Sequence, residues 1–232
     1  HGGGPQIAEM LKKKNIKTNF VEGLRVSDID TVKIVEQVLS NDINNKIVND
    51  INATGGKAEG FIGNKNNLIE AKKLNINVKT TDSNIEKILD IGFVGEPTKI
   101  NIDTLIKSIN KGNIPVIAPL GIDSKGMTFN INADTVAGAV ASSIKANKLL
   151  LLTDVDGILD ENKKLISLLS FKDARNIINK DYISGGMKPK ITTCIDAISN
   201  GVEKATILDG RIPHAIILEL FTEHGIGTQI YS

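Results

Sequence analysis

Two glycine-rich runs are the residues of this sequence best suited to hold a phosphate or a carboxylate. HGGG at residues 1–4 stands directly before a helical pattern, and its amides can approach an anion closely because no side chain covers them. SGGM at residues 184–187 precedes a second helical pattern and places Lys190 one turn into that helix. Bare amides with a cationic side chain suit phosphoryl chemistry, whereas a tight turn and a solvated surface lysine are the structural alternatives.

Polar residues at the predicted ends of strands could complete such a site. Arg25 has apolar neighbours, so it is either a bidentate clamp for a carboxylate or a charge at a strand edge. Asn130 and Asp134 lie between a predicted strand and a predicted helix, where a ligand contact and a structural role are equally open. Asn132, between them, is predicted to be the N-cap of that helix.

The segment TDVDG at residues 153–157 follows the apolar residues 149–152. A strand that ends in this way presents a hydroxyl, carboxylates and flexible backbone to a nucleotide or its metal. A plain strand-end turn is the alternative, because Asp and Gly favour turns.

Several common catalytic arrangements are missing from the sequence. HGGG also forms an oxyanion-hole loop in esterases, but that chemistry needs a G-x-S-x-G elbow, which the sequence does not contain. Neither a G-x-x-x-x-G-K-[ST] loop nor a G-x-G-x-x-G fingerprint is present. Three His and one Cys cannot assemble a zinc site at the usual spacings, so we predict no metal site formed by the protein itself.

Composition excludes some classes of partner. The 28 basic and 27 acidic residues nearly cancel, which argues against binding to nucleic acid or to an anionic membrane surface. The apolar runs have the length of strands and not of membrane-spanning helices. The single Cys194 rules out an internal disulfide and fits a reducing compartment, and 232 residues suffice for one domain with a sizeable core.

Helix and strand patterns alternate along the chain, which predicts a layered α/β fold. Ser27 is predicted to cap a helix that carries Val32 and Val35, and Gly112 is predicted to end a helix that follows Asn101. The continuous apolar runs 114–120 and 149–155 predict strands buried on both faces. Further strands are predicted at 58–62, 67–72, 92–100, 204–208 and 228–231, and further helices at 43–51, 133–147, 171–180, 187–200 and 213–221.

Eight segments, in this order and spacing, resemble the acetylglutamate kinases of the amino acid kinase family. Each segment by itself is weak evidence, but the combination is specific and covers essentially the whole chain. HGGG shortly before GLRV distinguishes this branch from the kinases of aspartate, glutamate, carbamate and UMP. The segments are HGGGPQI (1–7), FVEGLRVSD (20–28), GFVGE (92–96), IPVIAPLGI (114–122), NINADTVAG (130–138), LLTDVDGIL (151–159), ISGGMKPK (183–190) and DGRIPHAIILELFTEHGIGTQI (209–230).

The resemblance implies a three-layer αβα sandwich around a mostly parallel sheet. It implies a single amino acid kinase domain with a substrate-binding lobe over residues 1–130 and an ATP-binding lobe over residues 131–232. The implied reaction transfers the γ-phosphoryl group of ATP, with Mg²⁺ held mainly by the nucleotide, to the side-chain carboxylate of N-acetyl-L-glutamate. The product would be an acyl phosphate, made in the second step of arginine biosynthesis.

The resemblance also implies roles for the residues around the acceptor. Gly3 and Gly4 would contact the substrate and the transferring phosphoryl group through their backbone amides. Arg25 would hold a substrate carboxylate, and Asn130 would bind the substrate nearby. No catalytic base is needed, because the nucleophile is already a carboxylate.

Further roles fall on the catalytic charges and on the nucleotide. Asp134 would orient catalytic lysines, and Lys190 would stabilise negative charge as the phosphoryl group leaves ADP. The nucleotide contacts would come from Thr153, Asp154, Val155, Asp156, Gly157, Ile158, Tyr182, Ile183 and Ser184.

Members of this family carry another lysine on a first strand that precedes HGGG. The sequence begins after that position, so we expect that strand and its lysine to precede His1 in the complete protein. We therefore expect residues 1–232 by themselves to turn over little or no substrate.

The C-terminal segment resembles forms of these kinases that arginine inhibits. His214, Glu223 and Gly227 are the candidates for contacts to an L-arginine effector. The resemblance implies a homodimer or a hexamer of dimers.

Two other functions stay open at this point. One is a catalytically silent module that binds arginine or a protein partner, and the other is a sibling kinase with a different acceptor. A bacterial cytoplasm and a plastid stroma both fit a sequence in which we see no targeting signal.

Overall fold

The computed structural model describes residues 1–79, 86–183, 185–223 and 225–232. These residues divide into two compact units, His1–Val136 and Ala137–Ser232. Within the described part of the chain, no helix has both the length and the apolar character that crossing a bilayer requires.

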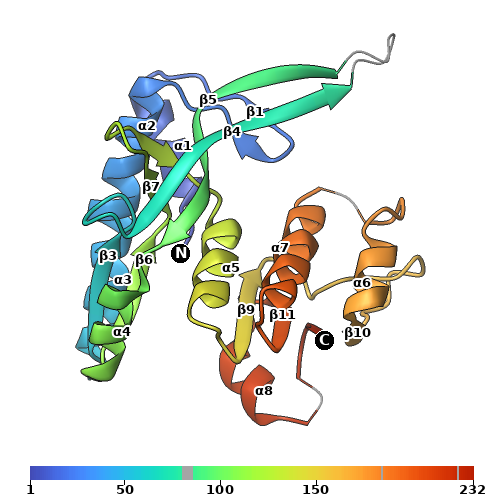
Figure 1. The fold of residues 1–232 in the computed structure, drawn as a ribbon. Helices are drawn as coiled ribbons and strands as arrows, with labels where there is room; N and C mark the ends of the chain where they lie inside the picture. Colours follow the sequence, from blue (N-terminus) through green and yellow to red (C-terminus); the bar gives the residue numbers. More distant parts are fainter. Residues whose placement is uncertain (80–85, 184, 224) are drawn as a thin grey trace. The chain divides into compact units, whose positions relative to one another are not determined.

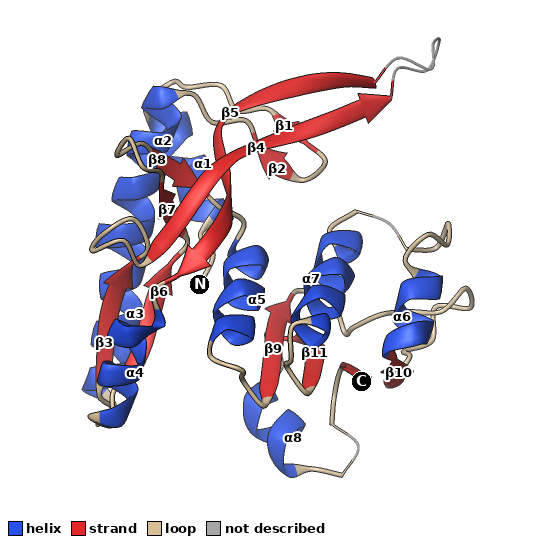
Figure 2. Cartoon of the chain, viewed as in Figure 1, coloured by secondary structure: helices blue, strands red, loops and turns tan. Residues whose placement is uncertain are grey.

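The first unit combines helices with parallel and antiparallel strand pairings, the longest of which is the hairpin of β4 and β5 (Figure 1, Figure 2). In its described part, β3 and β6 form a parallel pair, while β4, β5, β8 and β7 close into a small barrel. The elements are α1 (Gly4–Lys13), β1 (Phe20–Val21), β2 (Leu24–Arg25), α2 (Ile29–Gln37), the π-helix η1 (Val38–Asn44), α3 (Asn45–Ala53), β3 (Ala58–Ile62), β4 (Ile69–Lys79), β5 (Glu86–Ile100), α4 (Ile102–Asn110), β6 (Ile114–Ala118), β7 (Leu120–Ile122) and β8 (Thr128–Asn130).

An aliphatic core joins the first helix of this unit to its neighbours. The predicted apolar face of α1 is confirmed, because Ile7 and Leu11 are buried there against α2, η1, β6 and β7. Pro5 stands in the first helical turn, where its missing N–H costs no hydrogen bond. This packing fixes where α1 begins and therefore where the glycine run before it lies.

The start of α2 differs from the sequence prediction. Asp28, not Ser27, is the N-cap, and its carboxylate accepts a 2.8 Å hydrogen bond from the amide of Thr31. Ser27 is fully buried, and its hydroxyl donates to the carbonyl of Arg25 at 2.9 Å. Both residue types cap helices well, so local propensity does not separate two adjacent candidates. The tertiary contact of Ser27 decides between them.

The helix predicted over residues 43–51 does not stand apart from its predecessor. α2, η1 and α3 follow one another without a break from Ile29 to Ala53, and η1 is the π-helical segment between them. A π-helical insertion turns the residues after it to a different face of the helix. Asn44, the last residue of η1, is buried and reaches the glycine run, as described below.

The strand β5 is anchored to the segment before α2 at Gly92. The amide of Phe93 donates to the carbonyl of Ser27 at 2.6 Å, and the amide of Ser27 donates to the carbonyl of Ile91 at 3.1 Å. Gly92 has φ +78°, and a Cβ there would overlap the carbonyl oxygen of Ser27. Only glycine permits this close approach, which ties the segment after Arg25 to the barrel.

We expect Gly92→Ala to lower the free energy of unfolding by about 3 kcal/mol, because it adds a backbone clash to the cost of a left-handed alanine. Gly112→Ala is the matched control, since Gly112 also has φ +78° but no described atom lies within 4 Å of the added Cβ. The control should lose only about 1 kcal/mol. Urea unfolding of the three proteins measures both losses, and equal losses would contradict the close-approach argument.

The second unit is a helix-covered sheet. In its described part, the strand order is β10-β12-β11-β9, with β9 parallel to β11 and β12 antiparallel to β11. Its elements are α5 (Ala133–Ser143, which begins in the first unit), β9 (Lys148–Thr153), β10 (Leu168–Ser170), α6 (Phe171–Ile177), α7 (Met187–Ser199), β11 (Lys204–Asp209), α8 (Ala215–Phe221) and β12 (Thr228–Tyr231).

Alternate residues of β11 face opposite layers of this unit. Ala205 and Ile207 are buried in the core formed with α5, α6 and α7. Thr206 lies between them in sequence and donates to Glu219 of α8 at 3.1 Å. Because side chains alternate across a strand, α7 and α8 cover opposite faces, which gives the helix–sheet–helix layering that the resemblance implies.

The prediction that the apolar runs 114–120 and 149–155 are buried on both faces is wrong for part of each run. Ile114 is 50% exposed at the start of β6, and Leu152 is 45% exposed near the end of β9. Apolar character on every residue therefore does not mean burial on every face. The other predicted strands and helices lie within several residues of the observed ones, although β4 and β5 extend further than predicted. The run 114–120 is divided between β6 and β7, and the short strands β1, β2 and β10 were not predicted.

Candidate functional site

The glycine run and Arg25 line one cavity of the first unit, with a volume of about 210 Å³. The run approaches from the start of α1, Arg25 from β2 and Asn130 from the end of β8. The lining residues are Gly2, Gly3, Gly4, Ile7, Phe20, Gly23, Leu24, Arg25, Leu39, Val94, Pro119, Asn130, Ile131, Asn132 and Ala133. The cavity thus combines bare amides, one cation and an aliphatic wall, a combination that suits a small anionic ligand.

Close packing explains why the run needs glycine. A Cβ on Gly3 would overlap Cδ1 of Ile43 and would approach Cδ2 of Leu39 to 2.9 Å. The buried Asn44 amide holds the same segment from the other side, donating to the carbonyl of Val116 at 2.9 Å and lying 3.1 Å from Nε2 of His1. Asn44 was not predicted as a site residue from the sequence, because its position depends on the π-helix.

Arg25 is a buried cation with hydrogen-bonding capacity left over. Its side chain is folded inward, the residue is 8% exposed, and Nη2 donates to the carbonyl of Gly4 at 3.3 Å. Nη1 is buried and has no hydrogen-bond partner among the described residues. Burial lowers the pKa of the guanidinium, which nevertheless stays charged at neutral pH. Arg25 is therefore not an exposed charge, and one end of its guanidinium has donors to spare.

The polar residues at and after the end of β8 have different positions: one caps the next helix and one lines the cavity. Asn132 is confirmed as the N-cap of α5, because its side-chain oxygen accepts from the amides of Asp134 and Thr135 at 2.9 and 3.2 Å. Asn130 lines the cavity, and its amide lies 3.5 Å from the hydroxyl of Ser27. Asp134 stands in the first turn of α5, two residues after this cap.

In the second unit, the ends of two parallel strands bring polar residues together. Thr153 at the end of β9 is paired with Asp209 at the end of β11, and the amide of Gly210 donates to the carbonyl of Thr153 at 2.8 Å. The hydroxyl of Thr153 donates to the carboxylate of Asp154 at 3.2 Å. The carboxyl edge of parallel strands is where α/β proteins usually bind their ligands.

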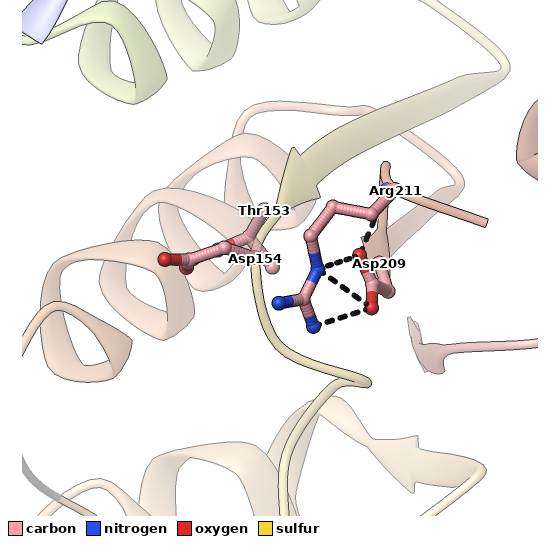
Figure 3. A network of polar contacts seen from close by, with 4 residues as sticks. All are labelled: Thr153, Asp154, Asp209 and Arg211. Atoms are coloured by element: carbon pink, nitrogen blue, oxygen red, sulfur yellow. Dashed lines mark hydrogen bonds and ion pairs between the residues drawn. The ribbon is translucent and has the colours of Figure 1, made fainter. Parts of the chain in front are cut away.

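Asp209 and Arg211 form a bidentate ion pair at this edge (Figure 3). Nε and Nη2 of Arg211 donate to the carboxylate of Asp209 at 2.9 and 2.7 Å, and the Arg211 amide adds a bond of 2.8 Å. These bonds lower the pKa of Asp209 and raise that of Arg211, to which Asp154 and Asp156 also contribute. No role was predicted from the sequence for DGR at 209–211. Its position directly after a predicted strand was the available signal.

Some of the residues predicted to contact the nucleotide have buried side chains that a ligand cannot reach. Ile158 and Ile183 are buried in the core of the second unit, whereas Val155 and Tyr182 are more than one third exposed. Gly157 has φ +149°, and a Cβ there would approach the Thr228 hydroxyl to 2.7 Å. Ser184 lies outside the described residues.

The second glycine run leads into α7 as predicted. Gly185 has φ +57°, Gly186 is the N-cap, and Pro189 stands in the first turn. Lys190 is the fourth residue of the helix and is half-buried. The helix dipole does not favour a lysine at this end of α7, but it does favour an anionic ligand there.

The candidates for an arginine effector lie around α8. His214 is the N-cap of that helix with φ 60°, and both His214 and Glu223 are exposed. Gly227 is buried, and a Cβ there would overlap the carbonyl oxygen of Ile207. Gly227 therefore has a structural reason to be glycine that needs no ligand.

A buried charge cluster lies beneath the same helix. Glu219 is 6% exposed, and its carboxylate accepts from Lys148 at 2.9 Å, from Thr206 at 3.1 Å and from the amide of Ile226 at 3.0 Å. Burial alone would raise the pKa of Glu219, but these partners outweigh it and lower the value. The cluster attaches the segment after α8 to the sheet. The signal in the sequence was Glu219 itself, an acidic residue within an otherwise apolar helix.

No group of three or more His, Cys, Asp or Glu that could hold a metal ion occurs among the described residues. A cation that acts here together with a nucleotide would take its ligands largely from the phosphates, as Mg²⁺ commonly does.

Comparisons with known proteins agree on one family. The sequence profile of the amino acid kinase family matches residues 1–209. An acetylglutamate kinase of Rhodopseudomonas palustris is 54% identical over 231 residues, which cover the whole chain and 78% of that protein. An acetylglutamate kinase of Rhodospirillum centenum is 54% identical over 230 residues, covering 99% of the chain and 75% of the relative.

Solved structures confirm the fold class. The N-acetylglutamate synthase from Neisseria gonorrhoeae, complexed with coenzyme A and N-acetyl-glutamate, matches with a TM-score of 0.82 at 24% identity. That match covers the whole chain and 51% of the synthase. The smu.665 protein of Streptococcus mutans matches the whole chain with a TM-score of 0.81 at 27% identity, over 84% of its own length.

Proposed function

The chain belongs to the amino acid kinase family, and from this premise we propose that it transfers the γ-phosphoryl group of ATP to the side-chain carboxylate of N-acetyl-L-glutamate. The observation that carries the proposal is the 54% identity, over the whole chain, to relatives named acetylglutamate kinase. The product is an acyl phosphate, and the reaction belongs to arginine biosynthesis.

The cavity of the first unit holds the acyl amino acid in this proposal. Arg25 pairs with the carboxylate that does not react, because the reacting carboxylate must stay available as the nucleophile. Asn130 binds the substrate nearby, and the amides of Gly3 and Gly4 contact the substrate and the phosphoryl group. The free Nη1 of Arg25 and the bare amides of the run support these assignments, since both are hydrogen-bond donors that an anion would use.

The strand ends of the second unit hold the nucleotide in this proposal. Thr153, Asp154, Asp156 and the backbone around Gly157 contact the nucleotide, as does Tyr182. Ser184, which is outside the described residues, stays a predicted nucleotide contact. Mg²⁺ enters with ATP and neutralises phosphate charge, and the exposed carboxylates of Asp154 and Asp156 are ligands of the type it prefers.

Charge neutralisation and positioning carry the reaction, because the carboxylate nucleophile needs no base. Lys190 stabilises the negative charge that develops as the phosphoryl group leaves ADP. Asp134 orients the lysines around the reacting atoms, and its place in the first turn of α5 suits a carboxylate.

Regulation and assembly stay predictions from the resemblance. The predictions are a homodimer or a hexamer of dimers, with L-arginine as an effector through His214 and Glu223. The named relatives come from bacteria, which favours a bacterial cytoplasm over a plastid stroma.

An ADP-release assay with a panel of acceptors tests the function. We expect turnover with N-acetyl-L-glutamate and at least about a hundredfold lower kcat/KM with L-glutamate or L-aspartate, because a site shaped for the acyl group leaves its polar groups unpaired without it. The complete gene product is the protein to assay. Preference for an unacetylated acceptor would indicate a sibling kinase, and arginine binding without any turnover would indicate a silent module.

A further inference from the structure

Two groups of the first unit hold the guanidinium of Arg25. The carbonyl of Gly4 accepts from Nη2 at 3.3 Å, and the ring of Phe20 lies under Cζ with 4.6 Å between Cζ and the ring centroid. That distance is within the range of a cation–π interaction. The carbonyl of Gly4 belongs to the backbone and stays in place whatever side chain is substituted. The ring of Phe20 can be removed by a substitution.

The hairpin β1–β2 fixes the two residues opposite each other. Phe20 pairs with Arg25, and Val21 pairs with Leu24, across an antiparallel register. Glu22 and Gly23 connect the strands with φ 49° and 80°, which is typical of a type I′ turn. Directly opposed side chains on one face of an antiparallel pair are close enough to interact. The turn residues therefore determine that the ring meets the guanidinium.

Without a ligand, one end of the Arg25 guanidinium is buried with donors that no described residue pairs, and a bound carboxylate would pair with them. Nη1 is buried without a hydrogen-bond partner among the described residues, while Phe20 itself is 58% exposed and lines the same cavity. A charged donor in this state favours rotation of the side chain toward water. The ring opposes that rotation by attracting the cation where it lies.

We propose that Phe20 is a positioning residue for substrate binding, because its ring holds the Arg25 guanidinium ready for the carboxylate of the acyl amino acid that does not react. This role rests on the proposed function. Without the ring, the guanidinium must be ordered at the moment of binding, and that ordering reduces the affinity. The effect passes through Arg25 and does not require contact between the ring and the substrate.

The test compares an aliphatic side chain with aromatic side chains at position 20. We expect Phe20→Leu to raise the dissociation constant for N-acetyl-L-glutamate about fivefold, whereas Phe20→Tyr and Phe20→Trp keep it within about twofold, because both retain an aromatic face. Isothermal titration measures these constants on the complete gene product. The dissociation constant for ATP should stay unchanged in all three variants.

The second ring that lies over an arginine supplies a matched control. Cζ of Arg175 lies 5.4 Å from the ring centroid of Phe171, and both residues belong to α6. Phe171→Leu should leave the affinity for N-acetyl-L-glutamate unchanged. A truncated ligand supplies another control. 4-Acetamidobutyrate keeps the reacting carboxylate but lacks the other one, so Phe20→Leu should weaken its binding by less than about twofold.

Each outcome decides a different question. A wild-type protein that does not bind N-acetyl-L-glutamate contradicts the proposed function. A wild-type protein that binds it, together with a Phe20→Leu variant that binds equally well, overturns the positioning role. Equal losses in the leucine, tyrosine and tryptophan variants, or an equal loss for the truncated ligand, also overturn it, because the aromatic face acting through Arg25 would not be the cause.

Discussion

Replacing Lys190 with methionine should lower kcat for phosphoryl transfer about a thousandfold, while the KM values for ATP and the acceptor change little. The physical reason is that the proposed role of the ammonium group appears only as charge develops between the phosphoryl group and ADP. An interaction made mainly in the transition state affects kcat and not ground-state binding. Methionine keeps most of the length and flexibility of the side chain, so packing at this half-buried position is preserved.

Lys188 is the matched control for this measurement. It lies two residues earlier on α7, is exposed, and points to a different side of the helix because the helical period is 3.6 residues. Lys188→Met should therefore keep kcat within about twofold. A Lys190→Met enzyme that retains more than about a tenth of wild-type kcat would contradict the catalytic role of this lysine.

Replacing Arg25 with glutamine should weaken the binding of N-acetyl-L-glutamate about a hundredfold, because a buried charge that pairs with a carboxylate is lost. The same change should leave the melting temperature nearly unchanged. It removes a buried Nη1 that has no partner among the described residues, and this gain offsets the lost contacts with Gly4 and Phe20. Titration of the acceptor and a thermal unfolding curve on the same samples measure both effects.

Arg175→Gln supplies the control for removal of an arginine that stacks on an aromatic ring, since Arg175 lies over Phe171 in the second unit. Its acceptor affinity should equal that of the wild type. Loss of binding accompanied by a large drop in melting temperature would indicate that Arg25 holds the hairpin β1–β2 together. Binding within about threefold of wild type would remove Arg25 from the site.

Local rules were sufficient for most elements of the fold. The strand at Ala58–Ile62 has the predicted bounds, and the helix after Asn101 ends before Gly112, whose φ of +78° is typical of a glycine that follows a helix. Asn132 caps its helix as predicted. These features depend on residues within a few positions of one another, so the sequence contains what decides them.

Local rules were insufficient where two local solutions are close in free energy. Ser27 and Asp28 are both good caps, and the buried place of Ser27 under β5 selects Asp28. The π-helix η1 likewise replaces the break expected between two helices, because Leu39 and Ile43 of that segment pack against Gly3.

The candidate site shows the same division. Gly3, Arg25 and Asn130 were predicted from residue type and resemblance, and the structure brings them to one cavity. Asn44, Phe20 and the pair formed by Asp209 and Arg211 were missed. An asparagine, a phenylalanine or a DGR triplet is common in any sequence, and only a partner at a specific distance gives it a role.

The order and spacing of its motifs were enough for the sequence to determine the family of this protein, since glycine runs and strand-end polar residues are read directly from the chain. Periodicity and capping determined most helices and strands for the same reason. Only the tertiary structure decided which side chains meet. Arg25 on Gly4, Asn44 on Val116 and Glu219 on Lys148 each depend on packing between elements that are far apart in the sequence. Such contacts are set by the free energy of the whole fold, and no single segment contains it.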